Sequence, residues 1–550
     1  MKTQEHIFFV SLSGSLPERE RPVCFEPGQT LAQAVYLSGL FQAPALCSGL
    51  GRCGRCRARL WPAPDPLPED GRVLSAPEIA DGWRLGCRHQ PVRGLRAELP
   101  TGILAEGAPL PRAAASSRAP AFLAVDLGTT SLEWRLETPE RLPLLQGRRL
   151  NPQMGAGSDV ISRLAVAASP KGRARLQDLI LSVLNGLVGG AEAGCSTQVG
   201  ALCLAANPAM TALALGGDTD CLARAPYSLP LAGGGWESLP GLPPLWIPPL
   251  LSPFVGGDIS AGYASLALDP EKPGPSRPFL LADLGTNGEF LLAISPGESL
   301  AASVALGPAL EGIGLSCGTE ARPGAVTGFS LTAAGLRPVF FRGIAADPAA
   351  GITGTGYLSL LHILRRAGAL DEDGRLFPSP LLRRIISPPS PAAATLFPPP
   401  AGDALRLAGG LFLSAGDVEE ILKVKAAFSL GLRRLLAEAG LVFSGLAHIY
   451  VAGALGQFVN IEALETLGFF PPGASARLTA VGNASLDGAA LLLAEPGARD
   501  ALQSWSAGAR TLDLACDPFF QRDFASAMRF SWSLPSPGHS GALPPAFNAP

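Results

Sequence analysis

Four cysteines near the amino terminus have a spacing that suits iron–sulfur chemistry. Cys47, Cys53 and Cys56 lie in the stretch CSGLGRCGRC, and Cys87 follows in LGCRHQ, which gives the pattern C-x5-C-x2-C-x30-C. Three thiolates in one glycine-rich loop, with a distant fourth, can surround a compact iron–sulfur cluster. Glycines in such a loop let the backbone fold tightly and turn N–H groups toward sulfur. They are Gly49, Gly51 and Gly54.

This cysteine pattern resembles that of plant-type ferredoxins, which bind a 2Fe–2S cluster through C-x4-C-x2-C and a distant cysteine. The first gap is one residue longer here, as in the adrenodoxin-like variant of that family. The flanking sequence predicts a strand in residues 7–14, a strand followed by a helix in 21–39, and another strand in 55–62. This is the order of elements in a β-grasp ferredoxin. Zinc and a disulfide are the alternatives, although structural zinc prefers paired C-x2-C motifs. A cluster implies a reducing cytoplasm.

A second chemical signal is the tetrapeptide Asp-Leu-Gly-Thr, which occurs twice. AFLAVDLGTTSLEWRLE and PFLLADLGTNGEFLLAIS each read as strand, glycine turn and strand, with Asp126 and Asp283 ending the first strands. Such a turn offers successive N–H groups to a phosphate, and the carboxylate can hold Mg²⁺ directly or through water. Two facing hairpins would hold the phosphates of a nucleotide from both sides. Two ordinary hairpins are the alternative.

The duplicated hairpin resembles the acetate kinase/sugar kinase/Hsp70/actin superfamily, in which two RNase H-like domains each contribute one phosphate hairpin around ATP. This resemblance assigns phosphate binding to the turn residues Gly128, Thr129, Thr130, Gly285, Thr286 and Asn287. An adenosine-binding turn is expected after the strand HIYVAG, at Gly453 and Gly456. Further positions for close approach are Gly312, Gly314, Gly482 and Asn483. Packing of helices on strands explains these glycines equally well.

The elements that position these residues are predicted from composition and periodicity. A chain of 550 residues predicts two or three domains. The expected division is 1–105 as a ferredoxin-like domain, 106–120 as a linker, 121–277 and 278–534 as two ATPase lobes, and 535–550 as a disordered tail. A helix is predicted over 416–439, with Lys425 solvated rather than reaching the nucleotide. Ser158 or Asp159 is expected to cap another helix.

Composition argues against several classes of function. The net charge of −3 and a hydrophobic content of 47% indicate a soluble protein with nothing that points to nucleic acid or acidic lipid. No secretory signal peptide is expected, and Ala439–Ile461 reads as a buried strand and turn rather than a membrane span. The other cysteines are expected to be small buried residues. They are Cys24, Cys195, Cys203, Cys221, Cys317 and Cys516.

Taken together, the chain resembles the family of ATP-dependent reductive activators of corrinoid proteins. The matching stretches are NPQMGAGSDVISRL, ANPAMTALALG, VGGDISAG, GPALEGIGLSCG, GITGTGYL, DVEEILKVKAA and VAGALGQF. There are departures: the linker leads almost directly into Asp126, Ala206-Asn207-Pro208 replaces the usual Gly-Asn-Thr, and residues 453–456 read Gly-Ala-Leu-Gly instead of Gly-Gly-Phe-Gly.

The resemblance implies a cytoplasmic α/β multidomain protein with a β-grasp ferredoxin-like domain and a duplicated RNase H-like ATPase core. Its cysteines would hold the 2Fe–2S cluster that passes one electron to Co(II) of a corrinoid protein and restores Co(I) for methyl transfer. Asp126 and Asp283 would orient Mg²⁺ and the water that attacks ATP. A low-potential electron donor and a homodimer are expected. The family stretch contains Asn151, Gln153, Asp159 and Arg163, to which the sequence assigns no chemistry.

Three other functions are compatible with parts of the pattern. A small-molecule kinase of the same superfamily could carry the ferredoxin domain as a redox sensor. A non-catalytic scaffold could bind ATP without turnover. An activator of a radical or dehydratase enzyme fits less well, because such relatives bind a 4Fe–4S cluster through one or two cysteines per subunit.

Overall fold

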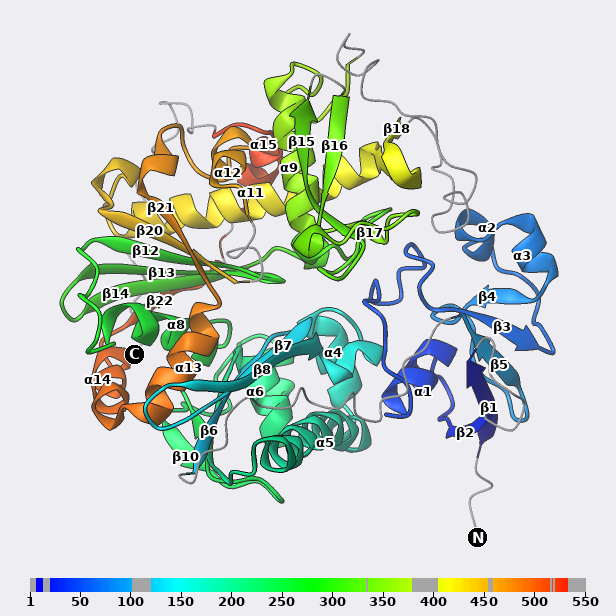
Figure 1. Ribbon diagram of the computed structural model, residues 1–550, viewed down its shortest axis with the longest axis horizontal. Helices are drawn as coiled ribbons and strands as arrows, with labels where there is room; N and C mark the ends of the chain where they lie inside the picture. Colours follow the sequence, from blue (N-terminus) through cyan, green and yellow to red (C-terminus); the bar gives the residue numbers. More distant parts are fainter. Residues whose placement is uncertain are drawn as a thin grey trace.

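The computed structural model describes residues 6–12, 20–100, 120–332, 335–377, 404–453, 459–514, 517 and 520–532. Within these ranges the chain forms a small sheet near the amino terminus and two six-stranded sheets with helices packed on them (Figure 1). The predicted linker 106–120 is described only at Pro120, and the predicted tail 535–550 lies outside the described residues.

The described residues between 6 and 100 form a five-stranded sheet of order β2-β1-β5-β3-β4. β1 and β5 run parallel, whereas the other neighbours are antiparallel. Thr30 and Gln33 form a capping box that starts α1, and the helix buries Leu31 and Val35 against the sheet. The elements are β1 (Ile7–Leu12), β2 (Arg21–Cys24), α1 (Leu31–Leu37), β3 (Arg57–Trp61), α2 (Asp70–Val73), α3 (Ala76–Ala80), β4 (Trp83–Leu85) and β5 (Arg96–Leu99).

The first large sheet has the order β10-β11-β9-β6-β7-β8. Its strands β6, β7 and β8 form an antiparallel meander, and β9 lies parallel to β6. The strands are β6 (Ala121–Leu127), β7 (Ser131–Glu137), β8 (Pro143–Leu150), β9 (Val199–Ala206), β10 (Gly235–Glu237) and β11 (Leu245–Ile247). The helices are η2 (Pro152–Gly155), α4 (Val160–Ala167), α5 (Pro170–Cys195), α6 (Pro208–Leu215), α7 (Asp220–Ala223) and α8 (Gly257–Ala267).

The second large sheet, of order β21-β20-β12-β13-β14-β22, has the same meander and parallel neighbouring strands, but its sixth strand, β22, lies beside the meander. β12, β13 and β14 form the meander, and β20 lies parallel to β12. The strands are β12 (Phe279–Leu284), β13 (Asn287–Ser295), β14 (Glu298–Ala305), β20 (His448–Ala452), β21 (Leu478–Gly482) and β22 (Arg510–Leu512). The helices after the meander are η3 (Pro308–Glu311), α11 (Ala415–Glu438), α12 (Ile461–Thr466), α13 (Ala484–Ala494), α14 (Pro496–Ser506) and α15 (Phe520–Ala527).

An insertion in the second half carries a separate small sheet (Figure 1). Its three strands are ordered β16-β15-β17, and helix α9 packs on β15. A two-stranded ribbon follows. The elements are β15 (Ala325–Thr332), β16 (Gly335–Phe340), β17 (Gly351–Ile352), α9 (Gly354–Arg366), β18 (Ala404–Arg406) and β19 (Phe412–Ser414).

Helices α8 and α13 pack against each other in the core shared by the two large sheets. A Cβ at Gly488 would lie 1.8 Å from Ala261 O, so a glycine is needed for this close crossing. Because α8 follows the first sheet and α13 follows the second, their contact fixes the hairpins of both sheets relative to one another.

Two predictions about helices have different outcomes. The helix predicted over 416–439 is α11, but Lys425 is fully buried, so the expectation of a solvated lysine was wrong. Its Nζ donates to Ala527 O at 3.2 Å and to Ser531 O at 2.6 Å. The apolar stretch around β20 is a strand, as predicted, and no helix among the described residues is long and apolar enough to span a membrane.

Candidate functional site

The two Asp-Leu-Gly-Thr turns face each other between the large sheets. One joins β6 to β7, and the other joins β12 to β13. Thr130 Oγ1 and Thr286 Oγ1 are hydrogen-bonded across the gap at 3.0 Å. In each hairpin the aspartate lies opposite a glutamate on the neighbouring strand, in the pairs Asp126–Glu133 and Asp283–Glu289. The two hairpins therefore contribute to one site.

A cavity of about 630 Å³ lies between the turns. The sequence-predicted residues in its wall are Asp126, Gly128, Thr129, Thr130, Asp283, Gly285, Thr286, Asn287 and Gly453. Gly453 has a φ of +89°, and a Cβ there would lie 2.3 Å from Asp283 Oδ1. Glycine is thus required for β20 to end against the second hairpin. Gly456, the other glycine predicted to bind adenosine, lies outside the described residues.

Polar side chains of the first lobe hold the first turn in place. Asn151 Nδ2 donates to Gly128 O at 2.8 Å, and the buried Arg163 guanidinium donates to Thr129 O. Asn207 Nδ2 donates to Thr129 Oγ1 at 3.1 Å, while its Oδ1 caps α6. The turn of the first hairpin is therefore positioned by three residues to which the sequence assigned no chemistry, Asn151, Arg163 and Asn207.

The neighbouring residues of the same stretch have structural roles. Asp159 caps α4 by accepting from Ser162 N, as one of the two predicted candidates. Gln153 Nε2 donates to Leu176 O at 3.0 Å, which fixes η2 on α5. Their hydrogen bonds hold the segment that carries Asn151 and Arg163.

Carboxylates dominate the cavity between the turns. Its lining includes Asp126, Glu133, Asp258, Asp283, Glu289 and Glu311. Only the two aspartates of the repeated motif were singled out from the sequence. Each hairpin also has a glutamate opposite its aspartate, Glu133 in the first and Glu289 in the second. This repeated glutamate is visible in the sequence, but the prediction did not include it. Asp258, at the first turn of α8, and Glu311, at the end of η3, reach the cavity only through the tertiary fold.

Hydrogen bonds orient several of these carboxylates. Asn483 Nδ2 donates to Asp126 Oδ2 at 2.8 Å and to Glu133 Oε2 at 3.1 Å. Ser485 Oγ donates to the other oxygen of Asp126 at 3.2 Å. Asn483 and Ser485 belong to the cap and first turn of α13, so this helix fixes the first aspartate. Asn483, predicted as a position of close approach, thus lies at the site, directly after Gly482.

Burial makes these carboxylates difficult to ionise together. It raises the pKa of Asp283 to about 7, with Asp258 as the next cause, and raises the pKa of Asp258 to about 6. Burial followed by Glu133 raises the pKa of Asp126 well above its ordinary value. For Glu289, burial followed by Asp258 raises the pKa in the same direction. Neighbouring anions and a low-dielectric environment both favour the protonated form.

This arrangement suits a cation that arrives together with a phosphate ligand. None of the described lining residues is Lys or Arg. In the part of the chain that the structure describes, no three His, Cys, Asp or Glu side chains already surround a point that could hold a metal ion. Mg²⁺ commonly keeps several waters and is held by one or two carboxylates plus substrate phosphates. The carboxylates therefore fit Mg²⁺ bound with a nucleotide better than a permanent metal cage.

The four predicted cysteines meet in a second cavity, of about 460 Å³. A hydrogen bond with Cys53 lowers the pKa of the Cys47 thiol to about 5. A hydrogen bond with Cys87 raises the pKa of Cys56 well above its ordinary value. The thiols thus form two pairs, one within the loop and one that links the loop to the segment after β4. All four are free thiols.

The cysteine loop has the backbone that its glycines predict. Gly49, Gly51 and Gly54 have φ values of +80°, +70° and +66°. Backbone N–H groups of Leu50, Arg52 and Cys53 hydrogen-bond to the sulfur of Cys47, and that of Gly51 bonds to Cys87. Hydrogen bonds from N–H to sulfur favour thiolates, and iron–sulfur sites use them to tune the cluster.

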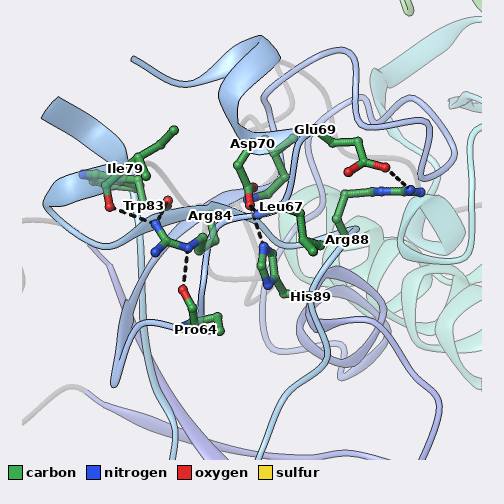
Figure 2. A network of polar contacts seen from close by, with 10 residues as sticks. Pro64, Leu67, Glu69, Asp70, Ile79, Trp83, Arg84, Arg88 and His89 are labelled. Carbon is green, nitrogen blue, oxygen red and sulfur yellow. Dashed lines mark hydrogen bonds and ion pairs between the residues drawn. The ribbon is translucent and has the colours of Figure 1, made fainter. Parts of the chain in front are cut away.

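The segment that carries Cys87 is anchored by the polar network of Figure 2. Buried Asp70 accepts from Leu85 N at 2.8 Å and lies 2.7 Å from His89 Nε2. Arg88 pairs with the Glu69 carboxylate. These contacts lie on both sides of Cys87 and hold it opposite Cys56.

The residues around the cysteine cavity fit a two-iron cluster. Each iron of a 2Fe–2S cluster takes two protein sulfurs, which matches two thiol pairs. Of the other cysteines, Cys195, Cys203 and Cys317 are buried as predicted. Cys24 is exposed and Cys221 is only partly buried, so the prediction was wrong for these two, and Cys516 lies outside the described residues.

Comparison with protein families gives two matches that together cover most of the chain. A family model described as the C-terminal domain of RACo, the ASKHA domain, matches residues 277–536. A second model, described as the RACo middle region, matches residues 122–271. ASKHA denotes the superfamily of the predicted duplicated hairpins, and the two matches correspond to the two halves that carry them.

Two curated relatives are similar to parts of the chain. The "[Co(II) methylated amine-specific corrinoid protein] reductase" of Methanosarcina barkeri is 28% identical over 256 residues, which is 43% of each chain. The "Corrinoid activation enzyme RamQ" of Eubacterium limosum is 26% identical over 426 residues, or 72% of this chain and 68% of that one. The first match therefore spans less than half of the length of that relative.

A solved structure shares the overall fold. The protein described as "Reductive activator for corrinoid,iron-sulfur protein" superposes with a TM-score of 0.65 and 22% identity. The match covers 95% of this chain and 98% of the other. The fold prediction of a multidomain α/β protein with an actin/Hsp70-like core is thereby confirmed.

Proposed function

This chain belongs to the RACo family of reductive activators of corrinoid proteins, and from that premise we propose that it returns one electron to an oxidised corrinoid protein in an ATP-dependent reaction. The reaction reduces Co(II) to Co(I) and makes the corrinoid competent for methyl transfer. Both curated relatives are named for acting on, or activating, corrinoid proteins. The observation that carries the proposal is one chain with a four-thiol cavity and a cavity between two phosphate-type turns.

The amino-terminal region is proposed to be a 2Fe–2S ferredoxin-like domain. Its cluster would be held by Cys47, Cys53, Cys56 and Cys87. When bound, the cluster would supply one-electron transfer at a reduction potential of about −400 mV, as in plant-type ferredoxins. The chain itself supplies the thiol pairs, the N–H groups that face sulfur, and the polar anchor behind Cys87. Support comes from the pairing of the thiols and from the sheet with parallel β1 and β5.

The cavity between the hairpins is proposed to bind MgATP. Gly128, Thr129 and Thr130 would contact phosphate from one side, and Gly285, Thr286 and Asn287 from the other. Asp126 and Asp283 would orient Mg²⁺ and the attacking water. Gly453, with Gly456, is assigned to the adenosine side. The position of the turns at one cavity supports these roles.

ATP has a physical task in such a reaction. Each ~60 mV of one-electron mismatch corresponds to about 1.4 kcal/mol, so a gap of a few hundred millivolts costs several kcal/mol. Nucleotide binding can supply this only if it favours one conformation of the protein over another. A link between the nucleotide cavity and the cysteine loop is therefore required by the proposed function.

The remaining assignments follow the same proposal. The ferredoxin-like domain is assigned to residues 1–105 and the linker to 106–120. The two ATPase lobes are assigned to 121–277 and 278–534, and the tail to 535–550. A low-potential donor would reduce the cluster. The cytoplasmic location and the homodimer stay predictions.

The deciding experiment mixes the anaerobically reconstituted protein with Ti(III), a Co(II) corrinoid protein and MgATP. The visible spectrum of Co(I) should appear only when ATP is present. Asp283→Asn and Cys53→Ser should each abolish it, whereas the matched variants Asp65→Asn and Cys221→Ser should retain it. Co(I) formation without ATP would contradict the proposal. ADP formation that depends on an added hydroxyl or carboxyl acceptor, without a corrinoid, would favour the kinase alternative.

A further inference from the structure

The cysteine loop is bound to the first ATPase lobe by a serine beside Cys47. Ser48 Oγ lies 2.8 Å from Ser158 Oγ and accepts from Ser158 N at 2.9 Å, and it donates to Asp159 Oδ2. Ser48 has a φ of +48°, which few non-glycine residues adopt. Its backbone is thus held in a specific conformation while its side chain contacts the start of α4.

This contact continues to the first phosphate turn. Ser158 follows Gly157, whose carbonyl accepts from Arg163 Nε at 3.1 Å. The same guanidinium donates to Thr129 O in the turn. A single buried arginine therefore connects the segment that receives Ser48 to the turn proposed to bind phosphate.

A second route joins the cysteine loop to the other turn. Arg55, between Cys53 and Cys56, donates to Gly318 O and also to Ala45 O at 3.1 Å. The segment before Gly318 begins at Glu311, whose Oε1 accepts from Thr286 Oγ1 at 2.8 Å. Ile313, between these two points, is buried in the core of residues 6–100.

The two routes meet where the turns touch. Thr130 and Thr286 hydroxyls are hydrogen-bonded to each other at 3.0 Å. Two hydroxyls in direct contact leave no space for a phosphate group between them. A phosphate held between these two hydroxyls would part them, and parting of the turns would draw the Ser158 and Gly318 segments, which are linked to the turns by hydrogen bonds, away from each other.

We propose that nucleotide binding and docking of the cysteine loop oppose each other. The loop is hydrogen-bonded to both segments, so it cannot keep both contacts when the turns separate. In the docked arrangement Met154, Gly155, Ala156 and Gly157 form one wall of the thiol cavity. Release of the loop would expose this side of the cavity to a partner that accepts an electron. The inference rests on the proposed function and adds its regulation.

Thermodynamic reciprocity makes the proposal testable without an activity assay. If nucleotide weakens docking, weaker docking must strengthen nucleotide binding by the same factor. Ser48→Ala removes the docking hydroxyl, and Arg55→Gln removes the second contact. Ser75→Ala is the matched control, because its hydroxyl bonds to Glu78 within residues 6–100. Affinity for a non-hydrolysable ATP analogue with Mg²⁺ is measured by calorimetry on cluster-loaded protein.

Ser48→Ala and Arg55→Gln should each bind the analogue about fivefold more tightly than the unaltered protein, because fivefold is the low end of typical allosteric coupling. Ser75→Ala should bind the analogue with the same affinity as the unaltered protein. If Ser48→Ala does not fold, Ser158→Ala tests the same contact from the other side. In the unaltered protein the analogue should also accelerate bleaching of the cluster by a bathophenanthroline chelator. The inference would be overturned if Ser48→Ala and Arg55→Gln bound the analogue with unchanged or lower affinity. It would also be overturned if the analogue left the rate of cluster bleaching unchanged. Failure of the unaltered protein to bind the analogue would instead contradict the proposed function.

Discussion

Replacing Asp283 by asparagine should stabilise the nucleotide-free protein, although it removes a residue proposed to be essential. The side chain is buried, and burial raises its pKa from 3.8 to about 7. This difference corresponds to about 4 kcal/mol that the folded state loses when the carboxylate is ionised. Asparagine has nearly the same shape and no charge, so it should recover much of this free energy.

The gain should depend on pH in a defined direction. A carboxyl group with a raised pKa stays protonated in the folded state after it has ionised in the unfolded state. Stability of the unaltered protein should therefore fall as pH rises from about 4 to about 7 and then level off. The difference between Asp283→Asn and the unaltered protein should be largest at pH 8 and should vanish near pH 4.

Thermal unfolding in the absence of Mg²⁺ and nucleotide tests this reasoning. At pH 8 the variant should have a melting temperature several degrees higher, since about 2–4 °C accompany each kcal/mol in domains of 150–250 residues. The exposed Asp65→Asn serves as the control and should show no such rise. An Asp283→Asn protein that melts at or below the unaltered protein at pH 8 would show that the carboxylate is not penalised by burial.

Three further predictions concern the metal sites and the core. Cys53→Ser should lose the visible absorption and iron of the cluster but still bind nucleotide, because Cys53 does not line the cavity between the turns. Loss of both properties would mean that the chain misfolds. Removal of Mg²⁺ with EDTA should weaken the affinity for ATP at least tenfold, as measured by calorimetry, because the carboxylates then repel the phosphates. An affinity that does not depend on Mg²⁺ would contradict the proposed nucleotide site. Burial lowers the pKa of Lys425 to about 7, so the unfolded state binds the extra proton between pH 7 and 10.5 and stability should rise across that range. Lys425→Met should lack this rise in denaturant titrations.

The local part of the site could be read from the sequence because its signals are local. Strand, glycine turn and strand are encoded within a few residues, and both Asp-Leu-Gly-Thr hairpins form where they were predicted. The cysteine loop is similar, since positive φ values at three glycines follow from their own flexibility. The long helix α11 also follows from its periodicity and its capping residues.

Features that depend on contacts between distant segments could not be read in this way. Asp258 and Glu311 enter the cavity from different elements, and nothing in their neighbouring residues marks them as acidic neighbours of Asp283. Lys425 was assigned to solvent because lysines on long helices usually lie there. It is buried because the segment near residue 530 covers α11 and offers two carbonyl oxygens.

The same distinction explains why the function needs the assembled chain. In the proposed function, the cysteine loop carries the electron and the cavity between the two hairpins binds the nucleotide. Coupling between them would need shared contacts. Polar contacts come from single side chains, Ser48 and Arg55 in the loop and Arg163 and Glu311 behind the turns. Apolar contacts come from Leu150, Met154 and Ile313, which pack into the core of the amino-terminal domain. A few hydrogen bonds contribute only about 1 kcal/mol each, which is small enough for nucleotide binding to reverse.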